Sequence, residues 1–280
     1  MTLEQSTQVA LVSTRTADGV LLQGALAGPD DATVGLLAVH GAWGNFYSSP
    51  ASELLRAGPA RGLRVLSLNL RSHDLGSLGD GEPCIGFVRH RMEDGVLDLD
   101  GALALLLEVG VERVGVVAHS FGSALAAYWL KQYRPAQVTG LALASPAPPL
   151  SSAARWFVDG ALDHHLALAA RAVAEGDPHR LLVLSSSAPV PMVAEAATVL
   201  NVWGPDTSAL THLHVGEIGV PLLVTSALRE PSIYRAYAEQ VAAAAVDADF
   251  EVLDDDHYYS ADRSGLAALV LDWFARRALL

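Results

Sequence analysis

The chain has 280 residues, of which 51% are hydrophobic, and a formal net charge of -13. Because nucleic-acid binding needs clustered Lys and Arg, this acidic balance argues against a nucleic-acid partner. The single cysteine, Cys84, excludes a disulfide framework and a thiolate metal site. No apolar run approaches the roughly 18 residues that would indicate a membrane span.

The start of the chain lacks a basic region followed by an apolar stretch, so no secretory signal is expected. We therefore expect a cytoplasmic protein. Its oligomeric state, monomer or homodimer, stays open at this stage.

Two β-rich segments open the chain, residues 8–13 and 19–28, and the Asp18-Gly19 pair between them is a hairpin signal. From residue 34 onward, apolar strands alternate with helices. The predicted strands are 34–41, 63–71, 113–120, 138–146, 220–227 and 249–255. The predicted helices are 48–62, 92–110, 121–135, 232–245 and 262–278.

Near-continuous apolar strands that alternate with helices indicate a mostly parallel sheet of about eight strands, covered by helices on both faces. The alternation is interrupted over residues 147–215, which are helical and rich in loops. We interpret the chain as one α/β core, residues 1–146 and 216–280, with 147–215 inserted as a helical cap after the sixth strand. Ligands of open α/β sheets bind at the carboxyl ends of the strands, where such a cap belongs.

Ser120 lies in "AHSFG", between a predicted strand and a predicted helix. A nucleophile elbow needs small residues two positions before and two after the serine, because the backbone turns sharply there. Ala118 and Gly122 occupy those positions. The alternative interpretation is an ordinary strand-to-helix turn, and the strand-turn-helix context favours the elbow.

The stretch "VHGAWGN" follows the strand that begins at residue 34. Acyl transfer needs backbone N–H donors aimed at the developing oxyanion. Ala42 in this loop and Phe121 after the candidate nucleophile can supply two of them. A glycine-rich loop shaped only by turn geometry is the competing interpretation.

His257 lies in "DDDHYYS", between the last predicted strand and the last helix, where it can act as the base that a serine nucleophile needs. There are ten histidines, so its place at the sheet edge is the informative feature. His119 is expected to be structural. The histidines of the insertion lack ligand-spaced partners, so we expect no metal at His164, His165, His212 or His214.

A carboxylate must orient that base, and Glu230 follows the strand 220–227 in the order Ser, acid, His. Two alternatives remain open for this residue: a surface pairing with Arg229, and replacement in the role by Asp206. A further set of rivals adjoins His257 in sequence and has difficulty reaching its ring: Asp254, Asp255 and Asp256.

The stretches "HGAWGN", "AHSFG", "REP" and "DDDH" resemble the α/β-hydrolase fold superfamily, in particular its serine-aminopeptidase-like and lipase-like esterases. The resemblance covers about residues 8–279. It implies Ser120 as nucleophile, His257 as base and Glu230 as acid, with Ala42 and Phe121 as the oxyanion hole and no cofactor. Two departures are Ala118 in place of glycine and Glu230 in place of the commoner aspartate.

We therefore expect a serine hydrolase that cleaves an ester or related acyl bond of a small hydrophobic molecule through an acyl-serine intermediate. The alternatives are a thioesterase or acyltransferase, a carbon–carbon bond hydrolase, and a non-hydrolytic cyclase or ligand-binding protein, because fold does not fix function. Apolar residues of the insertion can line a substrate pocket or form its own core: Trp156, Phe157, Leu166, Met192, Val199 and Trp203.

Overall fold

The structure is a computed structural model that describes residues 6–48, 50–76, 86–148, 161–185 and 192–280. Its centre is an eight-stranded sheet with the strand order β1-β2-β4-β3-β5-β6-β9-β10. The strands of this sheet are β1 (Ala10–Arg15), β2 (Leu21–Ala27), β3 (Val34–Val39), β4 (Arg64–Asn69), β5 (Arg113–His119), β6 (Val138–Ala144), β9 (Leu222–Ala227) and β10 (Ala248–Leu253). The expected α/β architecture with a mostly parallel sheet is confirmed.

The two antiparallel pairings lie at one edge of the sheet, where β2 pairs with both β1 and β4. The hairpin between β1 and β2 turns at Gly19, whose φ of 88° suits glycine. The Thr16 amide donates to the Val20 carbonyl across this turn, at 2.9 Å. The remaining neighbours pair in parallel, so the carboxyl ends of β3, β5, β6 and β9 meet at one edge of the sheet.

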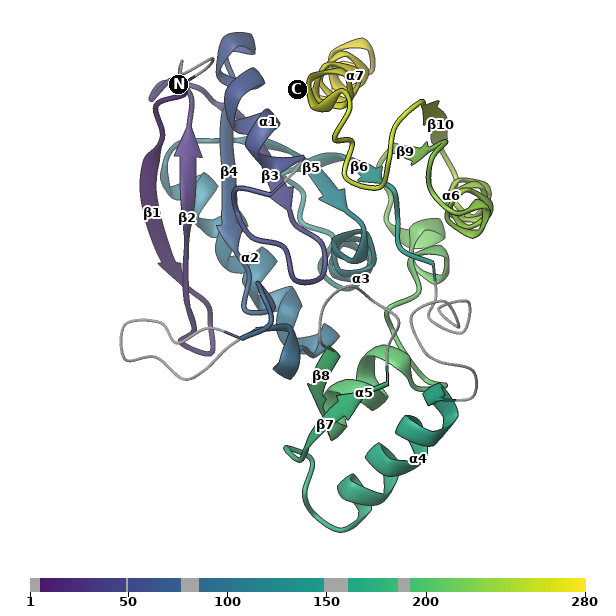
Figure 1. Cartoon of the computed structure of the whole chain (residues 1–280). Helices are drawn as coiled ribbons and strands as arrows, with labels where there is room; N and C mark the ends of the chain where they lie inside the picture. Colours follow the sequence, from purple (N-terminus) through teal and green to yellow (C-terminus); the bar gives the residue numbers. More distant parts are fainter. Residues whose placement is uncertain (1–5, 49, 77–85, 149–160, 186–191) are drawn as a thin grey trace, which may run out of the picture.

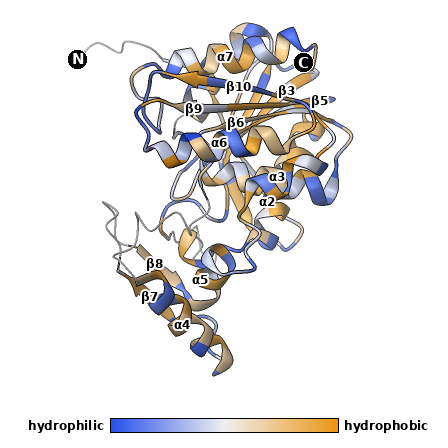
Figure 2. Cartoon of the chain, turned by 90° about the vertical axis from the view of Figure 1, so that its right-hand side faces the viewer, coloured by the Kyte–Doolittle hydropathy of each residue, from blue (hydrophilic) through white to orange (hydrophobic). Residues whose placement is uncertain are grey.

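Helices cover both faces of the sheet because its strands are apolar on both sides. Along β3, Leu37 and Val39 belong to one buried core, while Leu36 and Ala38 belong to the other. Figure 2 shows α7 on one face and α2, α3 and α6 on the other. The helices are α1 (Ala51–Ala57), which contacts α7 (Arg263–Arg276), and, on the opposite face, α2 (Met92–Glu108), α3 (Phe121–Tyr133) and α6 (Ser232–Ala244).

The chain between β6 and β9 leaves the main sheet and forms a small unit of its own, as Figure 1 shows. We call its described residues, 161–185 and 192–217, the insertion. It contains α4 (Ala161–Ala174), β7 (Leu181–Leu184), β8 (Met192–Glu195) and α5 (Ala196–Trp203). Trp156 and Phe157, expected as apolar residues of this region, and Cys84 lie outside the described residues.

The insertion contains the expected helices, α4 and α5, and in addition two strands that were not predicted, because β7 and β8 pair as an antiparallel two-stranded sheet. Each strand has four residues, and Leu181 and Val183 of β7 are largely exposed. Strands this short carry too few residues for an alternating pattern to stand out in the sequence.

Polar contacts attach the insertion to the segment that precedes α2, which begins with the short 3-10 helix η2 (Phe87–Arg89). The Asn201 amide group accepts from the Met92 backbone N–H at 2.9 Å and donates to Glu93 at 2.8 Å. Thr198 donates to the Val88 carbonyl, and the buried Glu195 pairs with Arg89 at 2.7 Å. These contacts fix α5 next to the start of α2.

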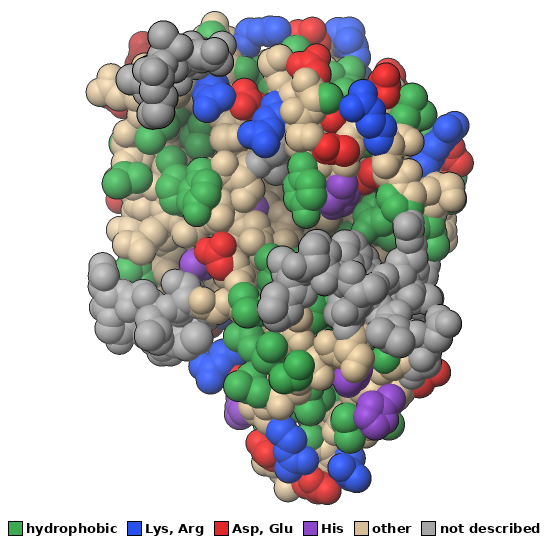
Figure 3. Space-filling view, in the orientation of Figure 1, with side chains coloured by type: hydrophobic (Ala, Val, Ile, Leu, Met, Phe, Trp, Pro, Cys, Tyr) green, Lys and Arg blue, Asp and Glu red, His purple; other side chains and the backbone are tan. Residues whose placement is uncertain are grey.

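The outer surface separates charged from uncharged regions. In Figure 3, charged side chains gather at the α7 end of the molecule and at the tip of the insertion, while the region between them carries mainly hydrophobic and other uncharged side chains. Among the helices in the described ranges, none is both long and apolar enough to cross a membrane.

Candidate active site

Ser120 occupies a strained backbone position between β5 and α3. Its φ of 54° and ψ of -122° lie outside the regions that L-residues ordinarily adopt. Such strain persists only where the surroundings enforce it, and here the neighbouring loop presses close. A Cβ added to Gly122 would lie 2.4 Å from the His40 carbonyl oxygen, and one added to Gly41 would lie 2.9 Å from the Ser120 Cβ.

Ala118 stands where an elbow usually has glycine, and the structure accommodates its methyl group. Ala118 is fully buried in β5, and its carbonyl accepts a 3.3 Å hydrogen bond from the Ser123 hydroxyl at the start of α3. The space two residues before Ser120 therefore admits one methyl group, whereas the space at Gly122 admits none.

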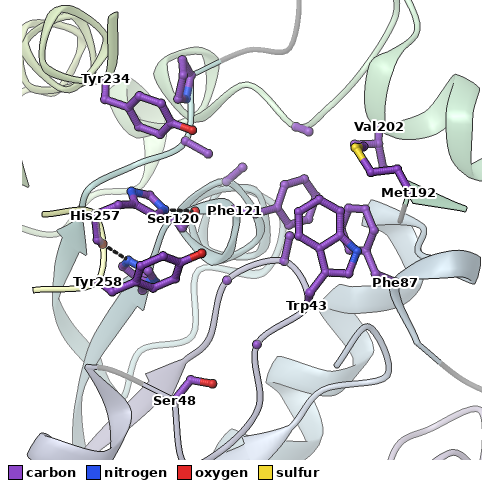
Figure 4. A pocket seen from close by; sticks show the side chains of 18 of the residues that line it. Trp43, Ser48, Phe87, Ser120, Phe121, Met192, Val202, Tyr234, His257 and Tyr258 are labelled. Atoms are coloured by element: carbon purple, nitrogen blue, oxygen red, sulfur yellow. Dashed lines mark hydrogen bonds between the residues drawn. The ribbon is translucent and has the colours of Figure 1, made fainter. Parts of the chain in front are cut away.

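A continuous hydrogen-bonded chain joins Ser120, His257 and Glu230. The His257 Nε2 lies 2.9 Å from the Ser120 Oγ, and the His257 Nδ1 lies 2.5 Å from the Glu230 Oε1. The Glu230 side chain is fully buried, whereas that of His257 is 22% exposed. Figure 4 shows the His257 ring directed at Ser120 on the wall of a pocket. The three residues singled out in the sequence thus meet, although they come from three separate loops.

Glu230 is held at the end of β9 by local donors. Its Oε2 accepts the Ala227 backbone N–H at 2.9 Å and the Ser226 hydroxyl at 3.3 Å, which leaves Oε1 for His257. Its neighbour Arg229 pairs instead with Asp254, at 3.2 Å. The alternative that Glu230 is a surface partner of Arg229 is therefore wrong.

The rival carboxylates are engaged elsewhere. The buried Asp255 accepts the backbone N–H groups of Asp256, Ala261 and Asp262. The Asp256 carboxylate accepts from the Tyr258 and Ser260 backbone N–H groups. Asp206 is exposed and does not line the pocket. Of these carboxylates, Glu230 alone contacts the ring of His257.

Two residues that line the pocket next to Ser120 carry the candidate oxyanion donors. Ala42 and Phe121 both line it, and neither amide donates a hydrogen bond to another described residue. The Phe121 amide is free because it belongs to the first turn of α3, where N–H groups have no partner within the helix. The pocket lining thus includes two backbone amides without a partner among the described residues, and their use as an oxyanion hole stays a prediction.

His40 anchors the loop that carries Ala42. Its Nε2 accepts the Leu70 backbone N–H at 3.1 Å, so Nδ1 carries the proton and donates to the Gly41 carbonyl at 2.8 Å. Burial lowers the pKa of His40 to about 4, which keeps the ring neutral at neutral pH.

His119 is the structural neighbour that the sequence predicted, with a specific contact that it did not. Its Nε2 donates to the His257 backbone carbonyl at 2.7 Å, and its ring lies 4.9 Å from the His257 ring. Burial lowers the pKa of His119 to about 3, so the ring stays a neutral donor. His119 therefore positions the loop of His257.

Tyr259 anchors the same loop from the buried side. It has a left-handed φ of 52° and is fully buried, and its hydroxyl bonds to Ser145 at 2.8 Å and to Thr225 at 2.7 Å. These partners belong to the ends of β6 and β9, so Tyr259 ties the His257 loop to two strands.

The pocket next to Ser120 has a volume of about 550 Å³. One end is aromatic: the Phe87 ring lies 4.9 Å from Trp43, 5.4 Å from Phe121 and 6.2 Å from Trp203. Met192 and Val202 of the insertion complete this end, which we call the aromatic end (Figure 4). Of the apolar residues expected to line a pocket or to form the core of the insertion, Met192 and Trp203 line the pocket, while Val199 is buried.

The histidines of the insertion bind protein groups. His165 accepts the Ser185 backbone N–H at 2.8 Å, and His214 donates to the Ser208 carbonyl at 2.7 Å. His212 lies 3.3 Å from the Tyr237 hydroxyl. Within the described ranges, no group of three or more His, Cys, Asp or Glu side chains is placed to hold a metal ion.

A parallel sheet with a serine elbow at its carboxyl edge, and a histidine and a carboxylate from the following loops, defines the class of α/β hydrolases. The model of the alpha/beta hydrolase family matches residues 36–269, and the chain belongs to this family. The resemblance read from the sequence is thereby confirmed.

Solved structures show the same fold. GrgF, an alpha/beta hydrolase from Penicillium sp. sh18, superposes with a TM-score of 0.73 at 13% identity, covering 96% of this chain and 98% of that one. Est1E from Butyrivibrio proteoclasticus, with ferulic acid bound, gives 0.69 at 13% identity over 95% and 98%. The Pyrococcus furiosus esterase Pf2001 gives 0.61 at 14% identity over 96% and 91%. No curated protein matches the sequence.

Proposed function

We propose that the protein is a serine hydrolase that cleaves an ester or related acyl bond of a small, apolar molecule, with no cofactor. The observation that carries the proposal is the hydrogen-bonded chain from Ser120 through His257 to Glu230, which opens into a pocket beside two free backbone amides. Membership of the alpha/beta hydrolase family supports it.

In the proposed reaction, the Ser120 hydroxyl attacks the substrate carbonyl while His257 Nε2 takes its proton. The amides of Ala42 and Phe121 donate to the oxyanion, and one such donor contributes about 10²–10³ in rate. His257 then protonates the leaving group, and Glu230 stabilises the imidazolium and fixes its tautomer. A water molecule, deprotonated by His257, releases the acid from Ser120.

The aromatic end of the pocket gives the proposal its substrate class. Four rings from Trp43, Phe87, Phe121 and Trp203 enclose this end, so a flat or branched apolar acyl group would bury its surface there. Est1E, an esterase of the same fold, holds ferulic acid, which is itself a flat aromatic acid. We propose that residues 147–215 act as a cap, since Met192, Val202 and Trp203 supply part of this wall.

The test is covalent labelling with a fluorophosphonate probe, followed by hydrolysis of short aryl esters. The native protein is expected to be labelled at Ser120 and to hydrolyse the esters, whereas Ser120→Ala does neither. Absence of labelling in the native protein contradicts a serine hydrolase of any kind. Labelling without ester turnover points to acyl transfer, which uses the same nucleophile.

A further inference from the structure

The two ends of the pocket differ in chemistry. Away from the aromatic end, the rings of Tyr234 and Tyr258 lie 5.1 and 5.2 Å from the ring of His257 (Figure 4). Arg263, the first residue of α7, also lines the pocket and follows His257 closely in the chain. Among the described residues that line the pocket, Arg263 carries the only permanent charge, and no Asp or Glu lines it. We call this the polar end.

The proposed mechanism assigns the polar end to the leaving group. His257 must pass its proton to the leaving oxygen, so the leaving group lies on the His257 side of Ser120. Figure 4 shows Tyr234 and Tyr258 on that side and the aromatic end on the other. The acyl group therefore occupies the aromatic end, and the alcohol leaves on the side of Tyr234 and Tyr258.

The charge of Arg263 has no ion-pair partner in the part of the chain that the structure describes. Among the residues that the structure describes, no carboxylate lies within 4.0 Å of its guanidinium. The adjacent Asp262 caps α7 instead, accepting the Gly265 N–H at 2.8 Å and the Ser264 hydroxyl at 2.7 Å. Arg263 also stands in the first turn of α7, where the helix dipole disfavours a cation.

Arg263 is exposed, has no carboxylate partner among the described residues, and carries the only permanent charge in the described lining of the pocket, so it is suited to bind an anion. Arg presents a planar set of donors that match a carboxylate or a phosphate in two parallel hydrogen bonds. Such a ligand would offset both the unpaired charge and the unfavourable place on the helix.

We propose that Arg263 binds an anionic group, a carboxylate or a phosphate, on the alcohol that leaves during hydrolysis. This inference rests on the proposed function. The ester bond breaks, the alcohol oxygen takes the proton from His257, and water supplies the hydroxyl group of the released acid. The anionic group keeps its charge throughout and serves only to hold the alcohol at the polar end.

The test compares esters of one acyl group that differ only in the leaving phenol: 3-carboxyphenyl, 3-phosphooxyphenyl and the neutral 3-carbamoylphenyl. The native protein is expected to hydrolyse at least one anionic ester with a kcat/KM about two- to fivefold above that of the neutral ester, as one partly exposed ion pair allows. The better anionic ester distinguishes carboxylate from phosphate. In Arg263→Gln this preference is lost, so the kcat/KM of the anionic ester falls to about that of the neutral ester in the same variant.

Two controls accompany the test. Arg263→Lys keeps the charge without the planar donors and should retain part of the preference, and Arg276→Gln, at the far end of α7, should retain all of it. Equal preference in the native protein and in Arg263→Gln overturns the inference, although the proposed function still stands. If no ester is hydrolysed, the proposed function fails, and the inference is then decided by binding: 3-hydroxybenzoate must bind the native protein more tightly than 3-hydroxybenzamide, and Arg263→Gln must remove the difference.

Discussion

His119 shows how a residue beside the nucleophile can act on the base without touching the substrate's reacting atoms. Because its ring donates to the His257 carbonyl, removal of that donor should let the His257 loop shift. We expect His119→Ala to lower kcat for a neutral ester about tenfold with little change in KM, since misplacement of a catalytic group by about 1 Å is costly. His119→Gln, which keeps a donor at a similar distance, should recover most of kcat. Equal loss in both variants would mean that the ring's packing, and not its hydrogen bond, matters.

Glu230 gives a sharper test of the site at the same scale. Glu230→Gln keeps the shape of the side chain but loses the charge, and its amide can present a donor to His257 Nδ1. We expect kcat to fall by about 10³–10⁴, as for the loss of this acid in other serine hydrolases. Asp206→Asn, on an exposed side chain that does not line the pocket, should leave kcat unchanged, as steady-state kinetics will show. Near-native turnover in Glu230→Gln would assign the role to another carboxylate.

The candidate triad could be predicted because it follows from chain order and strand ends, which are local features of the sequence. The contacts of His119, Asp255 and Tyr259 could not, because each depends on the direction of a side chain across a turn. The aromatic end of the pocket could not be predicted from the sequence either. Phe87 and Trp203 come from distant segments, and nothing local in the sequence shows that their rings meet.

At the scale of elements, α5 matters through its attachment to α2. Asn201 satisfies the first N–H of α2 and holds the segment that carries Val202 and Trp203 into the pocket. We expect Asn201→Ala to raise KM several-fold for an ester with a bulky apolar acyl group, with kcat nearly unchanged. The loss of the hydrogen bond from the Met92 N–H to Asn201, at the start of α2, should also lower the free energy of unfolding by about 1 kcal/mol. A change in kcat with no change in KM would contradict this role.

The alternation of strands and helices in the core was predictable because each element is long enough to show its own period. The insertion was harder: α4 was recoverable as helix, but β7 and β8 have four residues each. Their pairing depends on contact with each other and not on a pattern within either strand.

At the scale of the whole molecule, buried histidines make stability depend on pH. Burial lowers the pKa of His40 to about 4 and that of His90 and His119 to about 3, whereas an unfolded histidine titrates near 6.5. As the pH falls below about 6.5, the unfolded state therefore binds more protons, and the stability present at neutral pH is lost. Asp98 opposes this, because burial raises its pKa to about 6 and the folded state gains that proton.

Three histidines against one aspartate leave a net difference of about two protons. The free energy of unfolding, measured in urea, should thus fall by about 3 kcal/mol between pH 6 and pH 5. His90→Phe provides the control, because neither ring nitrogen of His90 has a hydrogen-bond partner among the described residues and its ring stacks on Phe87. This variant should be at least as stable as the native protein at pH 7. Its free energy of unfolding should depend less steeply on pH, by the contribution of about one proton. An unchanged slope would show that His90 does not titrate between the two states.

The shared lining of the pocket has a consequence for the mechanics of the molecule. Ser120 and Trp43 belong to the core, whereas Met192 and Trp203 belong to the insertion, so a ligand that fills the aromatic end touches both. Such a ligand therefore also connects the insertion to the core. By mass action, an inhibitor at one hundred times its Kd adds about 2.7 kcal/mol to the free energy of any opening that releases it. Occupancy should therefore slow hydrogen exchange in β8 and α5, far from the reacting bond, and each product release would loosen the two parts again.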